Sequence, residues 1–189
     1  LNNTHIQTQS PSGLSLLDFI RENQQLKSTK IGCREGDCGA CTVLEGSIVH
    51  NQLVYKSIVS CLTPLINVQS KHIVTLEGLN MPNLSIVQQI MKDNAATQCG
   101  FCTPGFVVAL TSHLIEKSDR SSMDSIGGNI CRCTGYKSIH RAAIQIDIIK
   151  NSLLMGSEIQ QMVQKAWLPE YFLEIESRIK DIKAPTMDI

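Results

Sequence analysis

The chain has 189 residues, 42% hydrophobic and 18% charged, and its 17 basic side chains balance its 17 acidic ones. A formal net charge of zero gives no sign of binding to nucleic acid or to an anionic membrane surface. No apolar run approaches the roughly 20 residues that a membrane-spanning helix needs, and no segment resembles a secretory signal. The length suits one average domain or two small ones. Because the chain begins with Leu1 rather than Met, we expect its true N-terminus to be missing.

The first third of the chain has the pattern of a small sheet with one packed helix. Apolar side chains share one face of a helix that follows Gly13, namely Leu16, Leu17 and Ile20. Residues 42–50 carry apolar pairs on either side of Glu45-Gly46, which predicts a hairpin turn there. Residues 53–61 and 72–79 have the pattern of two further strands. Together these elements predict the β-grasp arrangement of a ferredoxin.

Four cysteines lie within this first third. Cys33, Cys38 and Cys41 follow the spacing C-x4-C-x2-C, and Cys61 comes after nineteen more residues. This is the spacing of plant-type [2Fe–2S] ligation, whereas zinc sites usually combine two C-x2-C pairs. Zinc or unligated thiols are the alternatives.

The residues between these cysteines suit a loop wrapped around a cluster. The glycines that allow sharp bends and close backbone approach are Gly32, Gly36 and Gly39. Backbone N–H groups aimed at the sulfurs would stabilise the negative charge of a four-thiolate cluster. We expect the charged residues of the loop to face solvent, and we assign no role to them: Arg34, Glu35 and Asp37.

From residue 83 onward the hydrophobic period is helical. Residues 83–94 predict a helix with Asn83 as a possible N-cap, and Thr103-Pro104 predicts a second, with Thr103 capping and proline at the first position. Residues 121–128 form a short connection, and residues 136–151 predict another amphipathic helix. This half is therefore expected to be all-α.

The other four cysteines form two close pairs, Cys99 with Cys102 and Cys131 with Cys133. A disulfide across the single residue between Cys131 and Cys133 would be strained, because alternate side chains of an extended chain point apart. Two thiolates that bind the same metal are easier to accommodate at this spacing than a disulfide. Cys102 and Cys133 each lie just before a predicted helix, whose N-terminal N–H groups favour an adjacent anion. The alternative is two ordinary helix starts that happen to follow cysteines.

Eight cysteines without an export signal indicate metal binding or redox chemistry rather than a disulfide framework, since the cytosol keeps thiols reduced. We therefore expect a cytoplasmic protein. The five histidines are scattered and pair with no thiol motif, so each is interpreted as surface or structural: His5, His50, His72, His113 and His140.

Three strings carry a resemblance to a known family: "GCREGDCGACTVL", "QCGFCTPGF" and "GGNICRCTGY". They resemble the iron–sulfur portion of the molybdenum hydroxylases, the xanthine dehydrogenase and aldehyde oxidase family of oxidoreductases, over about residues 1–150. The resemblance implies an α+β chain with a plant-type ferredoxin domain at 1–78, a four-helix domain at 79–152, and a helical linker or tail at 153–189. That tail resembles the linker to an FAD domain in xanthine dehydrogenase small subunits.

The resemblance also implies ligands and partners. One [2Fe–2S] cluster would be bound by Cys33, Cys38, Cys41 and Cys61, and a second by Cys99, Cys102, Cys131 and Cys133. The close pair would grip one iron or bridge from one iron to the other. Gln98 and Cys133 become candidate contacts to a molybdopterin held by a large subunit, and an FAD domain or subunit would receive the electrons. The chain itself carries no hydroxylation site.

Several functions remain open on the sequence. The resemblance favours an electron-relay subunit, most like that of a xanthine dehydrogenase, with an aldehyde or another substrate as the alternative. A free-standing ferredoxin-like carrier and a zinc-stabilised interaction module are the rivals. In the tail, Phe172, Ile175, Ile179 and Ile182 predict a helix stopped by Pro185, whose apolar stripe is expected to pack on a neighbour.

Overall fold

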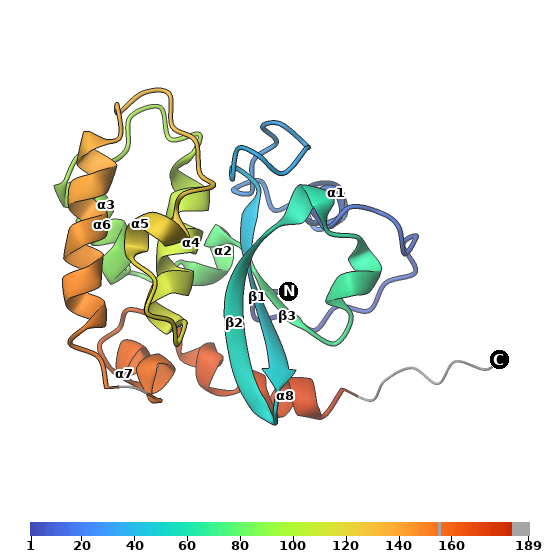
Figure 1. Ribbon diagram of the computed structural model, residues 1–189. Helices are drawn as coiled ribbons and strands as arrows, with labels where there is room; N and C mark the ends of the chain where they lie inside the picture. Colours follow the sequence, from blue (N-terminus) through green and yellow to red (C-terminus); the bar gives the residue numbers. More distant parts are fainter. Residues whose placement is uncertain (155, 183–189) are drawn as a thin grey trace.

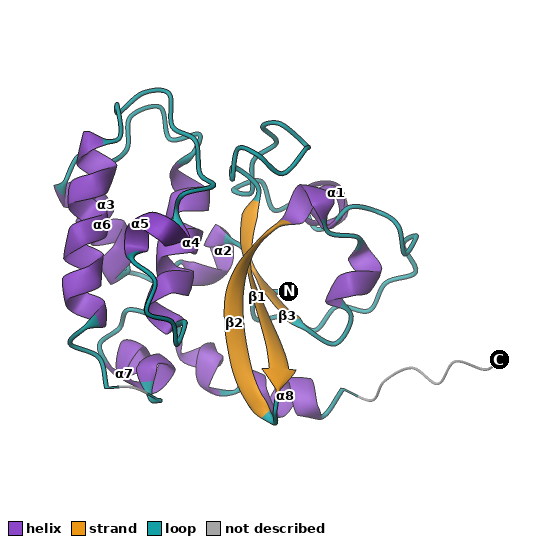
Figure 2. Ribbon diagram, in the orientation of Figure 1, coloured by secondary structure: helices purple, strands orange, loops and turns teal. Residues whose placement is uncertain are grey.

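A computed structural model describes residues 1–154 and 156–182, and it contains a small sheet beside a group of helices (Figures 1 and 2). The three strands are β1 (Thr42–Val49), β2 (Gln52–Val59) and β3 (His72–Val74). Their order is β2-β1-β3, and both neighbours of the central strand run antiparallel to it. The expected mixture of helix and sheet is confirmed.

The hairpin turn predicted at Glu45-Gly46 is wrong, because β1 continues through both residues. The chain turns at His50 and Asn51, which have φ values of 47° and 63°, as a two-residue hairpin loop of the left-handed type requires. Gly46 serves a different purpose, since a Cβ there would lie 2.5 Å from the ring of Tyr55 on the neighbouring strand. The glycine makes room for a buried aromatic ring.

A short helix covers one face of the sheet. It consists of α1 (Leu16–Asp18) and a π-helical turn over Phe19–Asn23, and Ser15 caps its start by accepting a hydrogen bond from the Asp18 N–H. Its apolar face packs against the sheet through Leu16 and Ile20, as predicted. Two 3-10 turns, Ser60–Leu62 and Leu65–Val68, carry the chain from β2 to β3.

The helical half is built around one buried helix. Its elements are α2 (Leu76–Leu79), α3 (Ile86–Asp93), α4 (Thr103–Ile115), α5 (Ser122–Ser125) and α6 (Lys137–Lys150). Every residue of α4 from Pro104 onward is buried, and the helix packs against β1 on one side and α3, α5 and α6 on others. The core therefore continues from the sheet into the helices without a break.

Two helix starts differ from the prediction. The N-cap of α3 is Ser85 rather than Asn83, because Ser85 forms a capping box with Gln88. The N-cap of α4 is Cys102, and Thr103 is already its first helical residue. The second shift places a cysteine directly at the N-terminus of the central helix.

The last described segment folds back along the sheet. It contains α7 (Glu158–Gln164), a 3-10 turn (Glu170–Leu173) and α8 (Ile175–Lys180), so the predicted continuous helix is broken after Leu173 and ends at Lys180. Phe172 is buried against this chain's own Tyr55 and not on a neighbouring protein. Pro185 lies outside the described residues. Within 1–154 and 156–182, no helix has both the length and the apolar character to cross a bilayer.

Candidate metal centres

All eight cysteines are free thiols, and the loops that carry most of them lie at one end of the molecule. In Figure 1, the loop of residues 33–41 and the loops that precede α4 and α6 are found at this end, while α7 and α8 lie at the other. Cys41 and Cys131 are buried, whereas Cys99 and Cys133 are exposed. The second group therefore has a buried and an exposed side, whereas the first group is at least partly covered throughout.

In the first group, the surroundings of two thiols shift their pKa values in opposite directions. The N–H of Glu35 donates to the Cys33 sulfur over 3.4 Å, and this bond, followed by one from the Cys38 thiol, lowers the pKa of Cys33 to about 7. Burial and a hydrogen bond with the Cys41 thiol raise the pKa of Cys61 to about 11. The sulfurs are thus grouped as Cys33 with Cys38 and Cys41 with Cys61.

Two of the predicted glycines are required by the geometry of this loop. A Cβ at Gly32 would lie 2.5 Å from the Cys38 sulfur. Gly39 has a φ of 64°, and a Cβ there would lie 2.5 Å from the side-chain nitrogen of Asn129. Arg34, which was expected to face solvent without a role, forms an ion pair with Asp18. The loop is therefore fastened to the rest of the chain on two sides.

The second group also divides into two pairs. The Cys133 and Cys99 sulfurs are 3.3 Å apart. Burial, and then a hydrogen bond with the Cys131 thiol, raise the pKa of Cys102 to about 12. Burial acts against the thiolate of Cys131, but the hydroxyl and N–H of Thr134 outweigh it and lower the pKa of Cys131. The Cys131 thiol is therefore associated with Cys102, and the Cys133 thiol with Cys99.

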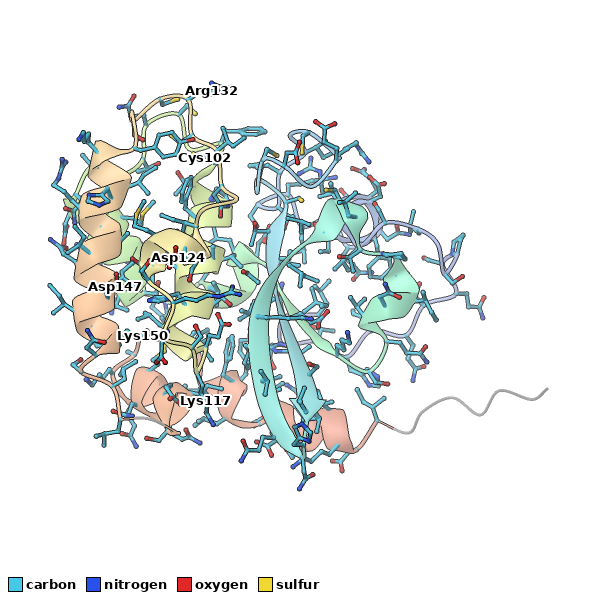
Figure 3. The ribbon with its side chains drawn as sticks, in the orientation of Figure 1. Cys102, Lys117, Asp124, Arg132, Asp147 and Lys150 are labelled. Atoms are coloured by element: carbon cyan, nitrogen blue, oxygen red, sulfur yellow. The ribbon has the colours of Figure 1, made fainter. Side chains whose placement is uncertain are left out.

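The two cysteines predicted to precede helices differ in their surroundings. Cys102 is the residue directly before α4, as expected. Cys133 is not at a helix start, because α6 begins at Lys137 and the residue before it, Tyr136, is left-handed with a φ of 64°. The Tyr136 hydroxyl instead accepts a hydrogen bond of 2.8 Å from the Cys131 N–H. Figure 3 shows Arg132 at the outer tip of this loop, farther from the helices than Cys102.

The two groups of cysteines are joined by backbone contacts that the sequence did not predict. The N–H of Ile130, next to Cys131, donates to the carbonyl of Cys38 over 3.0 Å. Beside it, the side-chain amide of Asn129 donates to the carbonyl of Gly39 over 3.0 Å. A Cβ at Gly105 would overlap this same carbonyl oxygen. The only signal for this contact in the sequence was the "GGN" that precedes the C-x-C motif.

The remaining candidate residues lie apart from these contacts. Gln98 is exposed beside Cys99. His72 and His113 are buried and hydrogen-bonded, to Tyr55 and to Asp147 among others, which fits the structural role expected of them. In the described part of the chain, no three or more His, Cys, Asp or Glu side chains converge on a position for a single metal ion. What the geometry offers is eight thiols in two groups, including a direct contact between the Cys99 and Cys133 sulfurs.

Comparison with known proteins places both halves in described families. Residues 1–65 match the "2Fe-2S iron-sulfur cluster binding domain", and residues 75–144 match the "[2Fe-2S] binding domain". The donor set fits these cofactors, because each [2Fe–2S] cluster takes four thiolates and eight are present in two groups. The chain therefore carries two [2Fe–2S] domains.

Relatives of known function share these domains. The chain is 43% identical over 145 residues to xanthine dehydrogenase from Blastobotrys adeninivorans, which covers 73% of this chain but only 10% of that protein. Among solved structures, it resembles quinoline 2-oxidoreductase from Pseudomonas putida 86, with a TM-score of 0.62 and 33% identity over 75% of this chain and 86% of that one. Aldehyde oxidoreductase from Desulfovibrio gigas gives 0.66 and 29%, over 81% and 17%. The chain thus belongs to the molybdenum hydroxylase family, as its iron–sulfur, electron-transferring portion.

Proposed function

We propose that this chain passes single electrons between two [2Fe–2S] clusters inside a xanthine dehydrogenase-like molybdenum hydroxylase. The clusters would supply one-electron oxidation and reduction. The first would be held by Cys33, Cys38, Cys41 and Cys61, and the second by Cys99, Cys102, Cys131 and Cys133. We further propose a β-grasp domain over 1–78, a four-helix domain over 79–152 and a tail over 153–189 that leads toward an FAD domain.

The interactions among the thiols support a specific assignment of ligands to irons. Each iron of a [2Fe–2S] cluster takes two of the four thiolates. The pairs indicate Cys33 with Cys38 and Cys41 with Cys61 at the first cluster. At the second they indicate Cys99 with Cys133 and Cys102 with Cys131. Cys131 and Cys133 would then bind different irons, so the close C-x-C pair bridges the cluster.

The observation that carries the proposed relay is the hydrogen bond from the Ile130 N–H to the Cys38 carbonyl. It connects a ligand of the first cluster, through one hydrogen bond and a single peptide unit, to Cys131 of the second. Thiolates in separately moving domains would have no such fixed connection. The bond therefore favours a relay of two clusters at constant separation over two independent electron carriers.

The exposure of the second group supports its position next to the molybdopterin. Cys99 and Cys133 are exposed, and Gln98 lies beside them on the same surface. We propose that Gln98 and Cys133 contact a molybdopterin held by the large subunit, and that electrons leave through the first cluster toward FAD. Substrate hydroxylation would take place on the large subunit, with a purine as the favoured substrate class and an aldehyde as the alternative.

Iron and sulfide analysis of the anaerobically purified chain tests this function. Four irons and four sulfides per chain, with two distinct reduced [2Fe–2S] signals in electron paramagnetic resonance, are expected. A colourless protein that contains zinc would contradict it. Cys131→Ser and Cys133→Ser should each alter only the second signal. In the reconstituted complex, Cys131→Ser, which changes a ligand of the second cluster but no proposed molybdopterin contact, should leave hydroxylation with an artificial acceptor intact and abolish reduction of the flavin.

A further inference from the structure

Arg34 lies in the first cysteine loop with a backbone conformation that arginine rarely adopts. Its φ of 61° falls in the left-handed region, where a side chain is unfavourable and glycine is usual. The residue directly follows Cys33. A contact of the arginine side chain with another part of the chain can stabilise this backbone conformation.

The guanidinium of Arg34 forms a two-pronged ion pair with Asp18. Its Nη2 lies 2.8 Å from Oδ1 and its Nη1 lies 3.1 Å from Oδ2. The carboxylate is itself fixed, because the Ser15 hydroxyl donates to Oδ2 over 2.7 Å. Such a paired fork fixes orientation as well as distance. Helix α1 therefore holds, through its last residue, the residue next to Cys33.

The other end of α1 holds the segment that carries Cys61. The Leu16 N–H donates to the Thr63 carbonyl, and the Leu65 N–H donates to the Leu14 carbonyl, each over 2.8 Å. Helix α1 thus contacts both ends of the first group of cysteines. Asp18 binds Arg34, which is next to Cys33, and the two backbone hydrogen bonds bind the segment that follows Cys61. No other described ion pair includes a residue of the loop from 33 to 41.

Arg34 also acts electrostatically on the sulfurs. The guanidinium is always charged in proteins, and it belongs to the residue that directly follows Cys33. A four-thiolate [2Fe–2S] cluster gains one negative charge on reduction. A nearby positive charge therefore favours the reduced form, and a nearby carboxylate favours the oxidised form.

We propose that the Arg34–Asp18 pair is a positioning device for the first cluster, which holds its ligand loop on α1 and balances two opposite charges beside it to set its reduction potential. This inference rests on the proposed function, since it requires the cluster to be present. It gives a role to two residues outside the ligand set.

Redox titration of the purified chain, followed by electron paramagnetic resonance, tests the proposal. Arg34→Gln leaves the carboxylate uncompensated and should lower the midpoint potential of the first cluster. Asp18→Asn leaves the guanidinium uncompensated and should raise it. Each shift is expected to approach a tenfold change in the reduction equilibrium, about 59 mV for one electron. The second cluster serves as an internal reference and should not shift.

Matched variants separate charge from simple loosening of the loop. The double variant Arg34→Gln/Asp18→Asn should return close to the wild-type potential, whereas loosening alone would move both single variants in the same direction. Glu176→Gln removes an exposed ion pair with Lys180 on α8, at the other end of the molecule, and should change nothing. If Arg34→Gln loses its iron, Arg34→Lys decides, because it keeps the charge without the fork. It should keep the wild-type potential but lose iron faster.

Different results would contradict the proposed function and the role of the Arg34–Asp18 pair. A chain that binds no iron at either group would contradict the proposed function itself. A chain with both clusters, in which Arg34→Gln and Asp18→Asn leave the first potential unchanged or shift it in the same direction, would contradict only the role of this pair.

Discussion

Asn129 donates its side-chain amide to the carbonyl oxygen of Gly39, which lies 90 residues earlier in the chain, over 3.0 Å. Both residues are in loops that carry cysteines, so one buried hydrogen bond fixes the two groups of thiols relative to each other. A second hydrogen bond, from the Ile130 N–H to the Cys38 carbonyl, also joins the second cysteine loop to the first.

Replacing Asn129 with alanine should therefore destabilise the chain and weaken the coupling of its two halves. The Gly39 carbonyl would lose one partner and keep the hydroxyl and N–H of Thr42, so the expected loss is that of one hydrogen bond, about 0.5–1.5 kcal/mol in the free energy of unfolding. Urea unfolding followed by circular dichroism measures the loss. Asn83→Ala, at an exposed position, is the control and should change stability very little. Equal effects of the two variants would contradict the role of Asn129.

Gly105→Ala should also destabilise the chain, although alanine favours helix over glycine by about 1 kcal/mol. The new Cβ would overlap the Gly39 carbonyl oxygen and push the first cysteine loop away from α4. Gly13→Ala is the matched control, since no atom lies within 4 Å of a Cβ at that position. Thermal unfolding of the two variants should differ clearly. A Gly105→Ala chain as stable as wild type would show that α4 and the first cysteine loop are not in close contact.

The tail can be tested with two adjacent residues. Phe172 is 1% exposed and contacts the rings of Tyr55 and His72, whereas Leu173 is 51% exposed. Phe172→Ala should lower the free energy of unfolding by about 3–5 kcal/mol, as for other buried aromatic residues. Leu173→Ala should have a small effect. Similar losses from both would mean that the tail does not pack against the sheet in solution.

The stability of the chain should fall with acid because of His72. This histidine is buried beside Tyr55, and burial lowers its pKa from 6.5 to about 4. Between these two values the unfolded chain binds a proton that the folded chain does not. The stability is therefore complete above pH 6.5 and decreases as the pH drops toward 4, by about 3 kcal/mol at most.

Unfolding by urea at a series of pH values from 7.5 to 5 measures this effect. His72→Gln cannot take up the proton and should show a shallower slope of stability against pH. His140, which is exposed, provides the control, since His140→Gln should keep the wild-type slope. An unchanged slope in His72→Gln would assign the acid sensitivity to other groups.

The sequence predicted the chemistry of the site better than its geometry. The spacing of the cysteines predicted two groups of four, because ligand spacing is a local property of the chain. It did not indicate that Cys131 and Cys133 contact different partners, since that depends on where the Cys99 and Cys102 loop lies after folding. The role of Asn129 was missed for the same reason, because its partner is distant in sequence.

Errors in the predicted elements have local physical causes. Gly46 was interpreted as a turn residue, but it lies within β1. A glycine is needed there because the ring of Tyr55 occupies the space of a side chain. Ser85 caps α3 in place of Asn83, since only Ser85 has a glutamine three residues later to complete the capping box. Arg34 was assigned no role because its partner, Asp18, lies in α1, outside the cysteine loop, and local spacing does not indicate that the two residues meet.

The tail also determines how short an expressed form of this chain can be made. Tyr171 donates its hydroxyl to the Gly78 carbonyl over 2.8 Å, at the point where the proposed first domain ends. A gene truncated after residue 152 would leave Tyr55 and His72 without the aromatic ring that covers them, although every cysteine would still be encoded. Recombinant expression of the iron–sulfur region should therefore extend at least to residue 182.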